Sequence, residues 1–307
     1  MHSLLLITSL SAIASASPAM AQSVGTTSPS DRGYFGIDTA ASNWIIEGFD
    51  PFANDTASDT FDLILINQGE TRCEIYPILE LNGEAFGLRA DGAGQPLAYV
   101  LYDGFGGYDA TPIAGRTVGR ANRRSVVIEP GNQQLIRYHL KVAGNNVRGD
   151  GLYSQIISVN AETLEGVPVA GRQIVIGLDV LPSARMGLAG AYRVRNGQAV
   201  VDLGELQEGP APIPLHLRIE STRSYRVSIE SQNNGQLVLA GSDWSIPYSM
   251  SVGGKDVILN SGTNEQSGNP VQKGDGVSLP VVFNIGNTAN QRAGKYGDVI
   301  SIAVSPN

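Results

Sequence analysis

Residues 61–81 read FDLILINQGETRCEIYPILEL, and this stretch decides the fold class. Apolar residues recur at every second position on both sides of a polar centre, as at Phe61, Leu63 and Leu65. A period of two is typical of a β-strand with one buried face. The centre, Asn67-Gln68-Gly69-Glu70, has the composition of a turn. The stretch therefore predicts two antiparallel strands joined by a polar loop.

A second stretch, residues 215–229, repeats this arrangement with the sequence LHLRIESTRSYRVSI. Phe61 and Leu215 are 154 positions apart, as are Cys73 and Val227. Further matches follow in the same order with offsets that fall from 152 to 143: 82–83 with 234–235, 97–99 with 246–248, 136–142 with 279–285, and 151–159 with 294–302. An ordered series of this kind indicates a duplicated unit.

Each copy is a series of short alternating strands separated by Gly, Pro, Asn and Asp turns, which is typical of a β-sandwich. We expect an all-β chain with two immunoglobulin-like β-sandwich domains in tandem. We place the first domain at residues 22–170 and the second at residues 171–307, with the boundary near the segment 166–171. The sequence leaves open whether the strand from Arg172 to Val180 closes the first domain or begins the second.

The N-terminus has the pattern of a secretory signal peptide. A short apolar run at residues 4–13 precedes Ala19-Met20-Ala21, which fits the small-x-small rule for cleavage. We expect residues 1–21 to be removed on export; the alternative is a buried N-terminal helix.

Composition excludes several classes of protein. Hydrophobic residues make up 42% of the chain and charged residues 16%, which argues against disorder and coiled coil. A net charge of −8 argues against nucleic-acid binding. The single cysteine, Cys73, excludes an intramolecular disulfide and a Cys-rich metal centre. We interpret it as a small buried hydrophobe; the alternative is a reactive or intermolecular thiol.

The sequence contains no motif of a known catalytic site: no Gly-x-Ser-x-Gly elbow, Walker A loop, His-Glu-x-x-His or Gly-x-Gly-x-x-Gly segment. His139 and His216 each lie within an alternating strand, opposite to their apolar neighbours, and we expect both to face solvent. We therefore predict no catalytic residue, no cofactor and no metal.

Two clusters of charge are interpreted as solvated loops. The acidic cluster matches no EF-hand spacing, and the basic cluster is set in an otherwise acidic chain. These clusters are Asp50, Asp55, Asp59 and Asp62, and Arg116, Arg120, Arg123 and Arg124.

An aromatic, Gly-rich segment at residues 99–108 is a candidate receptor-contact loop. Tyr102, Phe105 and Tyr108 have no counterparts in the second copy, whereas Tyr99 matches Tyr248 and is expected in the core. Exposed aromatic side chains bury a large area at little entropic cost. The alternative is a loop that folds back over its own core.

The last strand of the second copy lacks a successor. In the first copy the matching strand, 153–159, is followed by another apolar strand at 174–180, and the second copy has no such segment. We expect the second sandwich to be one strand short. Ile300, Ile302 and Val304, which share one face, then line a donor-strand groove that accepts a strand from another chain.

Residues 294–304, GKYGDVISIAV, together with Leu279-Pro280-Val281 and Ile246-Pro247-Tyr248, resemble the ending of spore coat protein U-like domains, the subunits of archaic chaperone–usher pili. Residues 97–103, LAYVLYD, are similar to the Tyr-x-Leu-Tyr stretch of the same domains. The resemblance implies incomplete immunoglobulin-like subunits that a periplasmic chaperone holds, an outer-membrane usher passes on, and donor-strand exchange joins to neighbouring pilus subunits. Two-domain members of the family resemble tip adhesins, with a receptor-binding N-terminal domain and a pilin-like C-terminal domain.

On this resemblance we expect a non-enzymatic pilus subunit, the tip adhesin, that crosses the periplasm to the cell surface and binds an unidentified receptor. Two alternatives stay open. Residues 128–137 resemble the Pro-Gly-x-x-Gln segment of periplasmic pilus chaperones, which donate a strand rather than lack one. A secreted carbohydrate-active enzyme needs only a carboxylate pair whose geometry is spatial rather than sequential.

Overall fold

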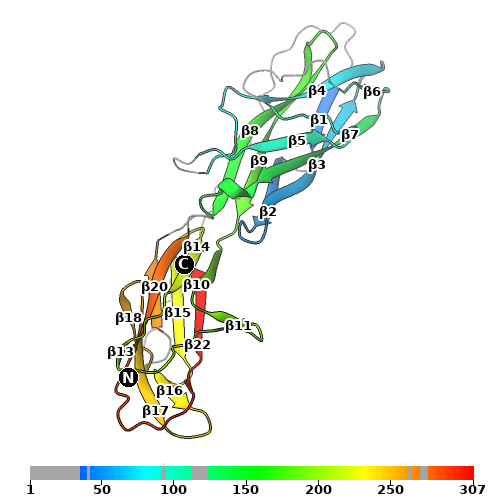
Figure 1. The fold of residues 1–307 in the computed structure, drawn as a ribbon. Coiled ribbons are helices and arrows are strands. Elements are labelled where there is room, and N and C mark those ends of the chain that lie inside the picture. The colour runs from blue at the N-terminus through cyan, green and yellow to red at the C-terminus, as the bar shows by residue number, and fades with distance from the viewer. Residues whose placement is uncertain (1–34, 40–41, 91–94, 113–123, 261–263, 270–275) are drawn as a thin grey trace, which may run out of the picture. The chain divides into compact units, whose positions relative to one another are not determined.

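The computed structural model describes residues 35–39, 42–90, 95–112, 124–260, 264–269 and 276–307. Strands dominate these ranges, and their only helical element is a single 3-10 turn at Gly144–Asn146. The described residues contain no helix that is long and apolar enough to cross a membrane. Two separate hydrophobic cores form, one from residues 35–180 and one from residues 215–285. Figure 1 shows the strands that carry them. The prediction of an all-β chain with two tandem sandwiches is confirmed.

The first sandwich has a four-stranded sheet and a five-stranded sheet, and side chains from both build its core. The four-stranded sheet has the order β1 (Phe35–Thr39), β3 (Thr56–Asn67), β7 (Gln133–Ala143), β5 (Tyr99–Asp103). The five-stranded sheet has the order β2 (Asn43–Phe49), β9 (Pro168–Val180), β8 (Gly151–Glu162), β4 (Cys73–Leu81), β6 (Val126–Ile128). All pairs are antiparallel except β2 with β9, which is parallel.

Strand β7 shows how alternation builds this core. Ile136, Tyr138, Leu140 and Val142 are buried, while the residues between them face outward. His139 is one of these outward residues and is exposed, as expected. His216 is half-buried, on the face of its strand opposite to the buried Leu215 and Leu217.

The centre of the first core is Trp44, which is only 1% exposed. Its ring stacks on Phe61 at a centroid distance of 5.5 Å and contacts Tyr138 at 5.6 Å. Trp44 comes from β2, a strand outside the repeated pattern. Its side chain joins the two sheets, because Phe61 and Tyr138 belong to the four-stranded sheet.

Strand β9 corrects the predicted domain boundary. It pairs along its length with β8 and on its other edge with β2. Ile174, Ile176 and Leu178 are fully buried in the first core. The strand from Arg172 to Val180 therefore belongs to the first sandwich, and the two cores divide after Val180 rather than at residues 170–171.

The second sandwich also has two facing sheets. The strand order of the larger sheet is β10 (Ala184–Gly190), β14 (Leu215–Ser221), β20 (Val277–Ile285), β17 (Ser245–Val252), β16 (Gln236–Leu239), β21 (Tyr296–Gly297). Strand β13 (Gly209–Pro210) pairs with β20, and β18 (Lys255–Val257) pairs with β17. The facing sheet has the order β19 (Asn264–Gly268), β15 (Tyr225–Ser231), β22 (Ile300–Pro306). A separate hairpin joins β11 (Arg193–Arg195) to β12 (Gln198–Val200).

The strand orders of the two sandwiches agree with duplication. The order β1-β3-β7-β5 in the first corresponds to β10-β14-β20-β17 in the second. On the facing side, β6-β4-β8 corresponds to β19-β15-β22. The first sandwich continues beyond β8 with β9 and β2, and within the described residues the second has no strand in either place.

Cys73 is half-buried and unpaired, and it lies against the edge of the first core rather than inside it. Its thiol lies 3.6 Å from the carbonyl oxygen of Thr71.

The loop predicted between residues 67 and 70 is organised by Asn67, whose side chain is fully buried. Its amide nitrogen donates to the carbonyls of Thr71 (2.8 Å) and Ile128 (3.0 Å), and its amide oxygen accepts from the N–H of Gly69 (3.0 Å). These three bonds join the β3–β4 loop to strand β6.

Asn67→Ala should lower the free energy of unfolding of the first sandwich by roughly 1–3 kcal/mol, because it leaves buried polar groups without partners. The measurement is urea unfolding followed by the fluorescence of Trp44 in a Trp244→Phe background, which leaves one of the two tryptophans. Asn54→Ala, at an exposed position, is the control and should change stability by less than about 0.5 kcal/mol. Equal effects of the two variants would contradict this role of Asn67.

Candidate strand-acceptor edge and aromatic loop

Among the described residues, strand β22 is paired on one edge only. It runs antiparallel to β15, with Ile302 opposite Ile229 and Val304 opposite Val227. No strand of the described ranges pairs with its other edge. Its counterpart β8 is paired on both edges, by β4 and by β9. We use the name open edge for this second backbone edge of β22 together with the side chains of Ile300, Ile302 and Val304.

The side chains of the open edge face the second core without being enclosed by it. Ile300, Ile302 and Val304 are half-buried and pack against the buried cluster. The matching residues of β8, Ile157, Val159 and Ala161, are 0% exposed. The exposed fractions differ because β9 lies along the second edge of β8 and shields its side chains, whereas no described strand lies along the second edge of β22.

Strand β10, at the edge of the larger sheet, shows a similar exposure. Met186 lies opposite the buried Ile219 and so points to the core side of β10, yet it is 42% exposed. Leu188, opposite Leu217, is half-buried. Figure 1 draws β10 beside β22, and the two strands make tertiary contact. Apolar side chains are therefore incompletely covered along both sheet edges on this side of the second sandwich.

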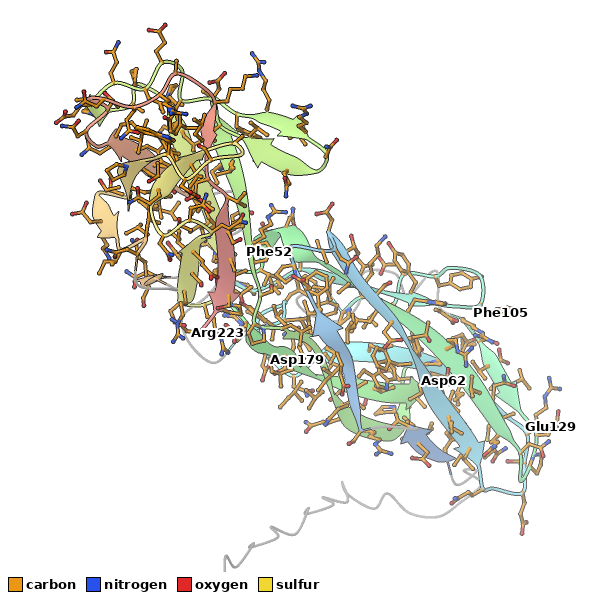
Figure 2. The ribbon with its side chains drawn as sticks, turned by 90° about the horizontal axis from the view of Figure 1, so that it is seen from below. Phe52, Asp62, Phe105, Glu129, Asp179 and Arg223 are labelled. Carbon is orange, nitrogen blue, oxygen red and sulfur yellow. The ribbon has the colours of Figure 1, made fainter. Side chains whose placement is uncertain are left out.

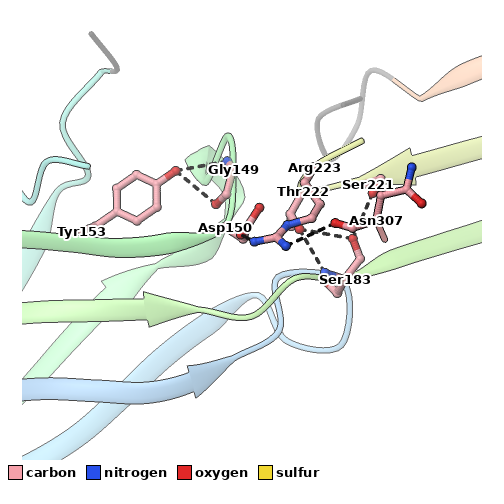
Figure 3. A network of polar contacts seen from close by, with 8 residues as sticks. All are labelled: Gly149, Asp150, Tyr153, Ser183, Ser221, Thr222, Arg223 and Asn307. Carbon is pink, nitrogen blue, oxygen red and sulfur yellow. Dashed lines mark hydrogen bonds and ion pairs between the residues drawn. The ribbon is translucent and has the colours of Figure 1, made fainter. Parts of the chain in front are cut away.

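The C-terminal end of β22 is held by backbone and side-chain bonds. The N–H of Asn307 donates to the carbonyl of Ser224 (2.8 Å). The guanidinium of Arg223 donates to the backbone oxygen of Asn307 (3.2 Å) (Figure 3). Close by, the hydroxyls of Ser221 and Thr222 donate to the carbonyl of Ser183, which ties the start of β10 to the end of β14 (Figure 3).

The predicted aromatic loop is exposed. Tyr102, Phe105 and Tyr108 are 39%, 67% and 43% exposed, so the alternative of a loop buried over its own core does not hold for these side chains. Tyr99 is buried, as expected. Figure 2 shows Phe105 at the outside of the first sandwich.

Arg124 supports this loop through contacts with Asp103 and Phe105. Its guanidinium forms an ion pair with Asp103 (3.1 Å) and lies 4.3 Å from the centre of the Phe105 ring. Asp103 is buried, and its carboxylate also accepts from the N–H of Phe105 (2.8 Å). Burial raises the pKa of the neighbouring Tyr138, and the charge of Asp103 raises it further.

The interpretation of the basic cluster as a solvated loop is wrong for Arg124. Arg124 is largely enclosed by its ion pair rather than solvated, and Arg116, Arg120 and Arg123 lie outside the described residues. In the acidic cluster, Asp55 and Asp59 are exposed, as expected, whereas Asp62 pairs with Arg137 (2.8 Å), which lowers the pKa of Asp62, and Asp50 accepts from Ser183 (2.9 Å). No group of three His, Cys, Asp or Glu side chains in the described part of the chain could hold a metal ion.

The sequence reasoning missed two polar residues on core-facing positions, Gln155 and Asp298. Gln155 lies in β8 and is buried, and Asp298 lies just before β22. They are 143 positions apart, the same offset as the strands that carry them. The detectable signal is a polar residue at the same core-facing position of both copies.

No family model and no curated protein sequence matches the chain. Among solved structures, the chain is similar to the complex of chaperone and tip adhesion subunit from the archaic chaperone–usher Csu pili of Acinetobacter baumannii, with a TM-score of 0.38, 14% identity, and coverage of 76% of this chain and 85% of that one. It is also similar to the CupB6 tip adhesin of Pseudomonas aeruginosa, with a TM-score of 0.39, 11% identity, and coverage of 89% and 94%. The E. coli chaperone DraB matches with a TM-score of 0.26, 12% identity, and coverage of 88% and 98%.

Arg124→Ala should destabilise the first sandwich by roughly 2–4 kcal/mol, because it leaves the buried carboxylate of Asp103 unpaired. Arg137→Ala removes the partner of Asp62 in an exposed ion pair and should cost about 0–1 kcal/mol. Urea unfolding of both variants, followed by the fluorescence of Trp44, gives the comparison. Adding Asp103→Asn to Arg124→Ala should recover part of the lost stability. If Arg124→Ala costs no more than Arg137→Ala and Asp103→Asn recovers nothing, this ion pair does not support the loop.

Proposed function

We propose that the chain is a non-enzymatic subunit of a surface pilus of the chaperone–usher type, and that its second sandwich accepts a β-strand from another chain. The observation that carries this proposal is the open edge of β22. A strand edge presents a row of unpaired backbone N–H and C=O groups, and a second strand can satisfy them by β-augmentation. The half-buried Ile300, Ile302 and Val304 supply the apolar contacts for its side chains.

The first sandwich provides a template for the accepted strand. Strand β9 pairs with β8 so that Ile174 lies opposite Ile157 and Ile176 lies opposite Gln155. Because β22 corresponds to β8, a strand in the place of β9 would bring its alternate apolar residues over Ile300 and its neighbours. The second sandwich would then gain the cover that β9 gives to the first.

The position at the pilus tip is part of the same proposal. The first sandwich is completed by its own strands β9 and β2, and so it needs no donor. It carries the exposed side chains of Tyr102, Phe105 and Tyr108 on a loop supported by Arg124. A complete domain with an aromatic surface suits receptor binding, whereas an incomplete domain suits attachment to the next subunit. The expected route is through the periplasm, with a chaperone and an outer-membrane usher, to the cell surface.

A pilus-assembly chaperone is the second candidate. The segment that suggests it, around Pro130 and Gly131, forms the turn between β6 and β7, in which Gly131 has a φ of 71° and donates to the carbonyl of Asn67. A chaperone gives a strand to its partner, whereas the open edge favours receiving one. Crosslinks in a pilus assembly that carries this chain distinguish the two: crosslinks from β22 to a foreign strand support the subunit, and crosslinks from this chain into a partner's core support the chaperone.

Appending a copy of the sequence of residues 163–180 after Asn307 should complete the second sandwich from its own chain. Three half-buried aliphatic side chains would become buried, which corresponds to roughly 2–5 kcal/mol of added stability. The measurement is urea unfolding followed by the fluorescence of Trp244 in a Trp44→Phe background. The matched control carries Ser at the three appended positions that copy Ile174, Ile176 and Leu178. Equal stability of both extended chains and the unextended chain would overturn the acceptor proposal.

Phe105→Ala with Tyr108→Ala should reduce the attachment of pilus-bearing cells to their target by at least about tenfold, since exposed aromatic residues commonly dominate binding energy. Unfolding of the purified chain and the number of pili per cell should not change, because both side chains are exposed. Leu164→Ala, at another exposed apolar position on the turn after β8, is the control. Unchanged attachment in the double variant would exclude this loop as the contact surface.

A further inference from the structure

The carboxylate of Asp298 accepts four hydrogen bonds just before the open edge begins. Oδ2 accepts from the hydroxyls of Tyr248 (2.6 Å) and Ser231 (2.5 Å). Oδ1 accepts from the backbone N–H groups of Asn233 (3.0 Å) and Val299 (2.7 Å). All four partners are donors, which matches a carboxylate, because an ionised carboxylate can only accept.

Three of these donors come from different parts of the second sandwich, and the fourth, the N–H of Val299, belongs to the next residue. Ser231 ends β15, Asn233 lies in the turn that leads to β16, and Tyr248 lies in β17. Ser231 and Tyr248 are buried. Burial raises the pKa of Tyr248, and its hydrogen bond to Asp298 raises it further, so the phenol keeps its proton as a donor. Asp298 therefore joins the first residues of the open edge to both sheets.

The first sandwich has an amide in the same place. The oxygen of Gln155 accepts from the hydroxyl of Tyr99 (3.0 Å) and from the N–H of Gly87 (3.2 Å), and its nitrogen donates to the carbonyl of Ala85 (2.8 Å). Tyr99 is the counterpart of Tyr248 in the duplicated sequence. Two donors and one acceptor suit an amide, and four donors suit a carboxylate. Each copy thus has the side chain that its own partners require.

The two strands differ in what else holds them. Strand β8 lies between β4 and β9, so its register is set on both edges. Strand β22 is paired with β15 alone among the described strands. A slip of one residue would turn Ile300, Ile302 and Val304 away from the core, because side chains alternate between the two faces. Before a second strand arrives, a fixed point at the start of β22 opposes such a slip.

We propose that Asp298 is the positioning residue that fixes the register in which β22 accepts an incoming strand. This inference rests on the proposed acceptor function. It assigns to Asp298 a role in strand exchange that is separate from the apolar contacts of the open edge. Asp298→Asn keeps the size of the side chain but places an NH₂ group among four donors, so the structure predicts that the amide cannot replace the carboxylate here.

The first experiment measures hydrogen exchange in the full chain without any added strand. Asp298→Asn should raise at least tenfold the exchange rate of those amides of residues 300–305 that are directed at β15, and it should leave the amides of β8 unchanged. Asp256→Asn, at an exposed position, is the matched control and should change neither strand. Tyr248→Phe, which removes one of the four donors, should also raise the exchange rate of β22, by a smaller factor. This variant provides the test if Asp298→Asn does not fold. Unchanged exchange in β22 of either variant would overturn the inference.

The second experiment reads register directly in the chain extended by the sequence of residues 163–180. Ser158 lies opposite Gln173 in the first sandwich, so Ser301 should lie opposite the appended copy of Gln173. In a Cys73→Ala background, position 301 carries a cysteine, and a second cysteine is placed either at that appended position or at the appended copy of Arg172, which lies opposite position 301 after a slip of one residue. The chain with Asp298 should form only the first disulfide, and Asp298→Asn should form both.

The outcomes separate the inference from the function on which it rests. If neither disulfide forms and the extension adds no stability, the acceptor function fails. The hydrogen-exchange comparison then still tests whether Asp298 holds β22 in place. If the extension stabilises both chains and Asp298→Asn forms only the first disulfide, the acceptor function stands and the positioning role of Asp298 is wrong. A purely structural role would lower stability without producing the second disulfide.

Discussion

The pairing of β9 with β8 is the contact on which the comparison of the two sandwiches depends. A strand in a sandwich has an apolar face that must be covered and two backbone edges that must be paired or exposed to water. In the first sandwich β9 meets both needs of β8, and β2 in turn pairs with β9 and brings Trp44 into the core. In the second, β22 has β15 on one edge and no described strand on the other, so its apolar face is covered only in part. One duplicated unit thus occurs in a closed and an open form.

The buried polar groups also differ between the closed first sandwich and the open second sandwich. Gln155 and Asp298 hold equivalent tyrosines, but the carboxylate also holds a turn and the start of a strand that is paired on one side. In the first sandwich, Asp103 and Arg124 place a buried ion pair beneath an exposed aromatic ring. Desolvation offsets much of the attraction within such a pair, whereas removing one partner leaves a buried charge and is costly. The aromatic loop is therefore held in place by polar contacts, while its rings remain exposed.

Much of this architecture could be predicted from local pattern. Alternation in residues 61–81 and 133–143 identified the strands and their buried faces, because a period of two depends only on the geometry of the extended chain. The match with Tyr248 identified Tyr99 as a core residue, and the period of two placed Ile300, Ile302 and Val304 on one face. Other features could not be found in this way. Trp44 lies in a strand outside the repeat, and Arg124 was grouped with neighbouring arginines because its partner, Asp103, lies 21 residues away.

By itself, the sequence determined that the chain is built from β-strands, that one unit occurs twice, and which side chains of most strands face inward. These properties are encoded within a few residues or in a repeated order of residues. Only the tertiary structure decided that β9 completes the first sandwich and that Asp298 gathers donors from two strands and a turn. The physical reason is that a strand can pair with any compatible edge. Which edge it finds depends on the packing of distant residues and not on the strand's own pattern.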